Sequence, residues 1–321
     1  MNILYIAAAI ITIIGLKFLS PFLIYLILSI FLTILIYPLV AFFEKRGMPL
    51  LVGYIFAAFL VILVFVVMFA VINSSLKEFL QNASFYQDKF VSLIIQINEY
   101  LKDFGIKIDN TYLSNIDFIP VIKAFLSKAG NLIKSFLIVF IGVSFMIFES
   151  KNFSKKLSLI TESEETFELF FKNTQKYFII KTFTSALTGI SVALMLLYFK
   201  IPYAWLFGIM AFVFNFIPVV GSIVAAIPGI LIAFITYDLK VVVYVTIGYV
   251  IINNIISNVI EPKLMGDGLD LSPAVVFFSL LLWGWVFGIV GTFLAVPLTM
   301  TLKLAFMSYE RTKWIGILLS K

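Results

Sequence analysis

Long uncharged apolar runs, separated by short polar connections, make up most of the chain. The uncharged runs extend over residues 3–16, 22–43, 47–76, 135–148, 182–199, 201–237, 241–260 and 272–301. A helix that crosses the hydrocarbon core of a bilayer takes roughly 20 apolar residues. The pattern therefore predicts an all-α fold: a polytopic integral membrane protein with about eight transmembrane helices, including two Gly/Pro-interrupted or re-entrant segments.

The first two apolar runs are separated by Lys17 and by the pair Ser20-Pro21. Serine followed by proline favours a turn, so residues 3–16 and 22–43 are predicted to form a tight helical hairpin. One long bent helix that starts at the membrane interface is the alternative.

Polar stretches divide the chain into five regions. Residues 1–76 are predicted to hold the first three spans, 77–130 a helical insert outside the membrane, and 131–148 the fourth span. Residues 149–176 are predicted to form a cytoplasmic loop with a surface helix, and 177–321 the core transport region. The insert is interpreted either as an oligomer contact or gate, or as a solvated linker between spans.

Two segments of the core region are apolar but interrupted by glycine and proline. Residues 201–237 carry no charge over 37 positions and contain Pro218 and Pro228. Residues 272–302 are also uncharged and contain Gly284, Gly288, Gly291 and Pro297. An interrupted helix in lipid needs protein or water to satisfy its free backbone groups. Both segments are therefore predicted to be broken or re-entrant, and a long tilted helix is the alternative for the second.

Paired interruptions of this kind point to a transport site at membrane depth. Between them lies the span 241–260, which is predicted to stack Asn254 and Asn258 on one helical face with Glu261. Hydrogen bonds between helices are the alternative role of the asparagines, and a salt bridge with Lys263 is the alternative for Glu261. The predicted substrate pathway comprises Asn215, Pro218, Gly221, Asn254, Asn258, Glu261, Pro262, Lys263, Gly288, Gly291 and Pro297.

Composition excludes several other classes of protein. The chain is 62% hydrophobic and only 12% charged, with a mean hydropathy of +1.12, and it has no cysteine and no histidine. Disulfides, histidine-based metal sites and Ser-His-Asp catalysis are therefore excluded, and no enzyme and no cofactor are predicted. Glu261, Asp267 and Asp270 could suggest a metal site, but three acids in a loop are more often solvated, so none is predicted.

The net charge of +6 is interpreted as a signal of membrane orientation, not of nucleic-acid binding. Single crossings of the eight runs would place Lys45, Arg46, Lys240 and the basic C-terminal tail on one side. The positive-inside rule then predicts that both termini are cytoplasmic and that the insert 77–130 lies outside.

The motifs of the core region resemble those of the autoinducer-2 exporter family of bacterial transporters. The resemblance lies in Ile217-Pro218-Val219-Val220-Gly221-Ser222, in Asn258-Val259-Ile260-Glu261-Pro262-Lys263, and in Gly288-Ile289-Val290-Gly291 with Ala295-Val296-Pro297. It implies a permease of about eight helices in the inner membrane, which assembles as a homo-oligomer. Members of the family are linked to export of the quorum signal autoinducer-2, and some relatives to sodium–proton exchange.

Three hypotheses for function follow. The first is a transporter or permease of a small polar solute, exporter-like, with a signalling molecule such as autoinducer-2 as its cargo. The second is a sodium (lithium)/proton antiporter that depends on Glu261, with a monovalent cation as the transported species. The third is a structural or scaffolding membrane protein whose insert binds partners.

Overall fold

The computed structural model describes residues 2–102, 120, 134–150, 164–218, 220–266 and 271–320. These residues form helices and no strand, which agrees with the predicted all-α class. Within them, five helices are long and apolar enough to cross a bilayer: Ile10–Glu44, Leu50–Gln81, Phe171–Tyr198, Leu239–Met265 and Pro273–Phe293. The protein is therefore a multi-pass membrane protein.

The N-terminal helical hairpin predicted from the sequence is wrong, because α1 is one helix of 43 residues, Asn2–Glu44, that continues through Pro21 and Pro38. A proline removes one backbone hydrogen bond from a helix. In lipid the remaining backbone groups still have no better partner than the helix itself, so the helix continues. Lys17 forms no turn either, and its ammonium donates a hydrogen bond to the carbonyl oxygen of Trp285.

The next helices are α2, Leu50–Gln81, and α3, Ala83–Lys102. Residues 134–150 are also helical and pack against α1 and α2 in a buried cluster. Within the insert 77–130, the described part is the end of α2, helix α3 and Pro120. On α3, Tyr86 is buried and donates a hydrogen bond to the hydroxyl of Tyr203 at 3.2 Å, so α3 is anchored to the core region.

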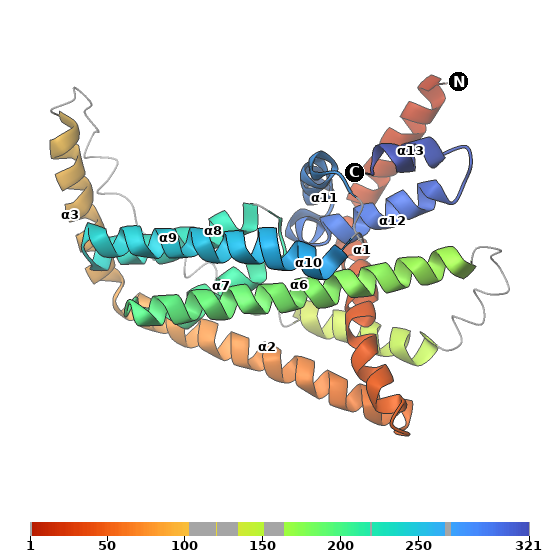
Figure 1. Ribbon diagram of the computed structural model, residues 1–321, viewed down its shortest axis with the longest axis horizontal. Helices are drawn as coiled ribbons and strands as arrows, with labels where there is room; N and C mark the ends of the chain where they lie inside the picture. Colours follow the sequence, from red (N-terminus) through yellow and green to blue (C-terminus); the bar gives the residue numbers. More distant parts are fainter. Residues whose placement is uncertain are drawn as a thin grey trace.

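Two long antiparallel helical columns form the middle of the core region and lie side by side in Figure 1. The first is α6, Glu164–Tyr198, which joins the predicted surface helix and the predicted fifth span into one helix. The second consists of α9, Leu239–Ile255, the π-helix Ile256–Ile260 and α10, Glu261–Met265. Lys176, in the first half of α6, donates to the carbonyl oxygen of Met265 at 2.8 Å, so this part of α6 lies beside the end of α10.

The two interrupted segments are helical hairpins. Hairpin 1 consists of α7, Ala204–Phe214, and α8, Val220–Thr236; hairpin 2 consists of α11, Pro273–Phe293, and α12, Ala295–Met307. In α11 the backbone leaves the helical conformation at Gly288, with φ 64° and ψ −146°. Pro273–Phe293 has the length of a span only if it is counted through this break. At about 1.5 Å per residue, no unbroken arm exceeds about 26 Å, less than the ~30 Å of a bilayer core.

Each hairpin turns back at a glycine that approaches the carbonyl group of its own first arm. A Cβ at Gly221 would collide with the carbonyl oxygen of Phe214, and a Cβ at Gly291 would collide with that of Trp283. Only glycine allows the two arms to come this close. The turns are therefore built in the same way in both hairpins.

Hydrogen bonds also fix the ends of the hairpins. The hydroxyl of Tyr237 donates to the carbonyl oxygen of Lys200 at 2.7 Å, which joins the exit of hairpin 1 to its start. The backbone N–H of Ser272 donates to the carbonyl oxygen of Leu319 at 3.3 Å, which joins the start of hairpin 2 to the C-terminal helix α13, Lys313–Leu318.

Candidate functional site at the meeting point of two hairpins

The turns of the two hairpins meet inside the protein. The ring centroids of Phe216 in hairpin 1 and Phe293 in hairpin 2 are 6.3 Å apart. Ile217 packs against a buried cluster of hairpin 2 that includes Trp283 and Phe287. The two segments that the sequence marks as interrupted, far apart along the chain, are thus brought into direct contact.

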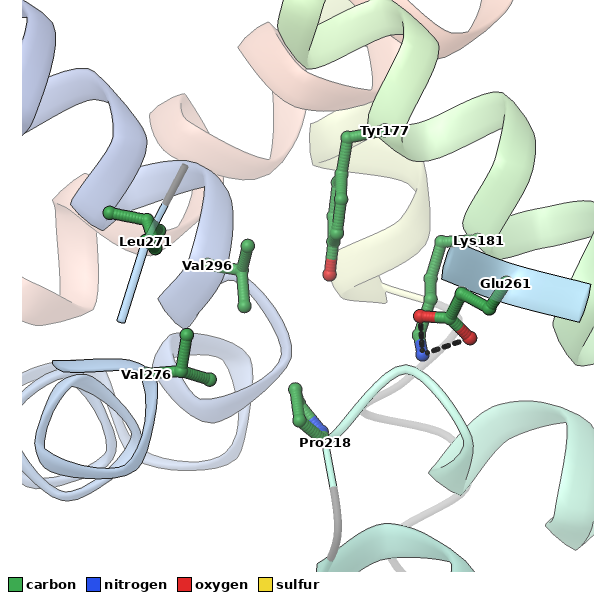
Figure 2. A pocket seen from close by; sticks show the side chains of 7 residues that line it. All are labelled: Tyr177, Lys181, Pro218, Glu261, Leu271, Val276 and Val296. Atoms are coloured by element: carbon green, nitrogen blue, oxygen red, sulfur yellow. Dashed lines mark hydrogen bonds and ion pairs between the residues drawn. The ribbon is translucent and has the colours of Figure 1, made fainter. Parts of the chain in front are cut away.

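A cavity of about 170 Å³ lies beside this contact. Its wall is formed by α6, α10, the turn of hairpin 1 and both arms of hairpin 2 (Figure 2). Leu271, two residues before hairpin 2, also contributes. The lining residues are Tyr177, Lys181, Pro218, Glu261, Leu271, Val276 and Val296. The wall therefore combines an apolar surface with a small number of polar groups, as solute-binding sites commonly do.

The main polar feature of the cavity is an ion pair between Lys181 of α6 and Glu261 of α10. The ammonium of Lys181 lies 2.8 Å from Oε1 and 3.0 Å from Oε2 of Glu261, and Thr184 Oγ1 lies 3.3 Å from Oε2. The side chains are only 5% and 15% exposed. Each charge is thus compensated at short range. A buried charge without such a partner would be strongly destabilising.

The π-helix directly before Glu261 determines where this carboxylate points. Pro262 has no N–H and cannot follow a regular α-helical turn without a clash. The chain accommodates it with five π-helical residues, Ile256–Ile260, which widen the turn. Glu261 consequently faces α6, whereas Asn254 and Asn258 are exposed on the outer surface of the column.

The hydroxyl of Tyr177, one helical turn before Lys181, is the third polar group at the cavity. It is buried and has no hydrogen-bond partner among the described residues. In Figure 2 it points into the space between Val296 and the ion pair.

Of the eleven residues predicted for the pathway, Pro218 and Glu261 line the cavity. Asn215 is buried nearby and donates to Ser185 Oγ at 3.0 Å, so it fixes hairpin 1 to α6. Gly221, Gly288 and Gly291 shape the two hairpin turns, and Pro297 is buried within α12.

Four predicted residues lie elsewhere. Asn254, Asn258, Pro262 and Lys263 are exposed. Asn258 donates to Asn254 Oδ1 at 2.9 Å within the same helix, and Asn254 donates to the carbonyl oxygen of Val250. Glu261 pairs with Lys181 and not with Lys263, so the alternative salt bridge is wrong.

The prediction missed Lys181 and Tyr177, although the sequence carried a signal. Between Tyr177 and Phe199, Lys181 is the single charged residue in an otherwise apolar stretch. A lone ionisable group within a span marks a functional site with a partner. The predicted fifth span begins at Thr182, directly after this lysine. Lys181 was therefore not considered as a charge within a span.

The prediction also missed an internal similarity between the hairpins. The second arm of hairpin 1 begins Val220-Gly221-Ser222 and continues to Ala226-Ile227-Pro228. The turn of hairpin 2 reads Val290-Gly291-Thr292 and is followed by Ala295-Val296-Pro297. Each hairpin also follows one of the two long columns, so the core region repeats the order column, hairpin, column, hairpin.

An apolar groove of about 390 Å³ lies along the hairpin contact. It is lined by side chains of α1, the helix at 134–150, α6 and both hairpins, among them Phe31, Phe178, Phe216, Ile289 and Phe293. We refer to the cavity and the groove together as the seam. It is lined by α6, α10 and hairpin 1, and by α1, the helix at 134–150 and hairpin 2.

Within the described part of the chain, no group of three or more acidic side chains could hold a metal ion. Asp267 and Asp270, considered with Glu261 in the sequence, lie outside that part.

The sequence as a whole decides the family. A family model described as AI-2E family transporter matches residues 6–311. The chain belongs to the AI-2E transporter family. Its members are transporters, so the membrane transport function inferred from the sequence holds at this level.

Individual relatives match over almost their full length. A candidate transport protein of Haemophilus influenzae is 32% identical, with 99% of this chain and 95% of that protein covered. The AI-2 transport protein TqsA of Escherichia coli is 28% identical over 95% of this chain and 91% of its own. The candidate transport protein YhhT of Escherichia coli is 25% identical, with 99% of this chain and 93% of YhhT covered.

Nothing in these comparisons supports the sodium–proton antiporter hypothesis. In the structure, Glu261, on which that hypothesis depended, is compensated by the ammonium of Lys181.

Proposed function

We propose that this AI-2E family protein exports a small polar solute through the seam between its two hairpins, and that autoinducer-2 is the first cargo to test. The observation that carries this proposal is the cavity beside the hairpin contact, with its buried ion pair. The cargo is suggested by the relative TqsA, which is named an AI-2 transport protein.

Both hairpins are proposed to be re-entrant. Their unbroken arms are short for a crossing. In hairpin 1 the contact between Tyr237 and Lys200 also holds the two ends together, and the start of hairpin 2 is tied to the C-terminal segment through Ser272 and Leu319. A segment that enters and leaves the membrane on the same side brings its turn to mid-depth, where free backbone groups can face a solute.

Hairpin 2 is proposed to move relative to hairpin 1. Hairpin 1 is fixed to α6 by close backbone packing, since a Cβ at Gly189 would lie 2.7 Å from the carbonyl oxygen of Gly208. At the turn of hairpin 2, no atom of the described residues lies within 4 Å of a Cβ placed on Gly288, so there is open space beside this break. Movement along the seam would open the cavity first to one side of the membrane and then to the other.

The protein is further proposed to be a homo-oligomer in the inner membrane. Asn254 and Asn258 are exposed in the middle of the apolar column. Amide groups are unfavourable against lipid tails, and a second copy that covers them removes this penalty.

The test of the proposed function uses purified protein in proteoliposomes loaded with autoinducer-2. Vesicles that contain the protein are expected to release autoinducer-2 faster than protein-free vesicles. A deletion strain should also accumulate more of the signal inside cells than its complemented parent. Equal release from the two kinds of vesicle would contradict export of this solute.

A further inference from the structure

The hydroxyl of Tyr177 is placed to bind a guest molecule. It is buried, it has no partner in the part of the chain that the structure describes, and it points into the cavity. A buried hydroxyl without a partner is destabilising compared with one that is hydrogen-bonded. The group is therefore available to a solute that enters the cavity.

The charges on the cavity wall cancel. Lys181 and Glu261 carry opposite charges 2.8–3.0 Å apart, and the other five lining residues carry none. An anion attracted by the ammonium is repelled by the carboxylate beside it, and the reverse holds for a cation. A charged solute would also lose its hydration without compensation.

The same pair still offers hydrogen bonds. An ammonium has three donors, of which two are directed at Glu261, and a carboxylate has about four acceptor positions. Together with Tyr177, the wall presents both donors and acceptors within one small space. Hydroxyl groups, which donate and accept, match such a wall better than groups that do only one.

Building on the transport function proposed above, we propose that the Lys181–Glu261 pair is a charge filter and that Tyr177 is a solute-binding residue. The solute they select is small, has no net charge and carries several hydroxyl groups. The cavity of about 170 Å³ provides space for a solute of this small size.

The class of solute is tested with three five-carbon probes of similar size in proteoliposomes: ribitol, the anion ribonate and the cation 1-amino-1-deoxyribitol. Ribitol is expected to leave at least about tenfold faster than either ion. Equal or faster release of an ion contradicts the charge filter. If autoinducer-2 passes and no probe does, the inference fails and the transport function stands; if nothing passes, both fail.

The charge filter is tested by single neutralisations that invert the preference. Glu261→Gln leaves the ammonium and is expected to favour ribonate, whereas Lys181→Met leaves the carboxylate and is expected to favour 1-amino-1-deoxyribitol. The double variant has no net charge at the site and should again prefer ribitol. It also keeps the charge filter testable if a single variant does not fold. Unchanged preference in every variant that folds contradicts the filter.

The role of Tyr177 is tested with Tyr177→Phe, which removes only the hydroxyl. The KM for ribitol is expected to rise about tenfold, since a lost hydrogen bond of about 1.4 kcal/mol corresponds to that factor. Tyr249→Phe is the matched control, because the hydroxyl of Tyr249 is also buried and has no hydrogen-bond partner among the described residues, but lies outside the cavity. Equal effects of the two variants would contradict direct binding by Tyr177.

Discussion

At the scale of single residues, the stability of the site depends on two charges that compensate one another. Lys181 and Glu261 come from helices 80 positions apart in the sequence, and both are largely buried. Removing one partner of such a pair leaves an uncompensated charge, which typically lowers stability by about 3–5 kcal/mol, whereas replacing both is often neutral.

Lys181→Met is therefore expected to lower the thermal unfolding midpoint of the detergent-solubilised protein, and the double variant with Glu261→Gln should recover most of the loss. The surface pair Lys313–Glu310, 3.6 Å apart with side chains 49% and 91% exposed, is the control. Glu310→Gln should leave the midpoint almost unchanged. A double variant no more stable than Lys181→Met would argue against a compensated pair.

At the scale of the elements, the hairpin turns depend on glycines that no other residue can replace. A side chain at Gly221 or Gly291 would collide with the backbone of the preceding arm, and Gly288 adopts a conformation that is accessible almost only to glycine. The sequence repeat around the two turns has the same physical origin, because both turns impose the same close approach.

Gly221→Ala and Gly291→Ala are expected to reduce the yield of folded protein strongly, with aggregation visible in size-exclusion profiles. Gly15→Ala is the control, since Gly15 lies within α1 and nothing lies within 4 Å of its built Cβ. Normal profiles for the two hairpin variants would contradict the geometry of the turns.

The elements also show what sequence reasoning could and could not predict. The interruption of residues 201–237 and 272–302 was predictable because Gly and Pro act locally on the backbone. The continuation of α1 through Ser20-Pro21 was not predictable from local turn signals. Lipid offers the backbone of a broken helix no alternative hydrogen-bond partner, so the helix continues. The direction of Glu261 was not predictable either, because the widened π-helical turn before Pro262 changes the face on which it lies.

At the scale of the whole molecule, the proposed re-entrant hairpins lead to a different membrane orientation from the one predicted from the sequence. The prediction that both termini are cytoplasmic counted two N-terminal crossings and one crossing for each interrupted segment. With one helix α1, and with both hairpins re-entrant as proposed above, the sides on which the connections lie are assigned again from contacts. The anchoring of α3 on Tyr203 places the end of α2 beside the start of hairpin 1.

Gly47 and Lys263 are accordingly expected on the cytoplasmic side, and Lys240 on the opposite side. All three positions are exposed, and the chain has no cysteine of its own. Single-cysteine variants are labelled in intact cells with a membrane-impermeant maleimide, and only the Lys240→Cys variant should react. Labelling of Lys263→Cys, or protection of Lys240→Cys, would contradict this assignment. Either hairpin 1 or the column that connects Lys240 to Lys263 would then have a different placement in the membrane.

The most direct test asks whether the two hairpins must separate for transport. Cysteines introduced at Phe216 and Phe293, whose rings lie 6.3 Å apart, are joined with a short thiol-reactive cross-linker that a reductant cleaves. Release of autoinducer-2 from proteoliposomes is expected to stop after cross-linking and to return after reduction, while either single-cysteine variant stays active. Undiminished release from fully cross-linked protein would contradict passage of the solute between the hairpins.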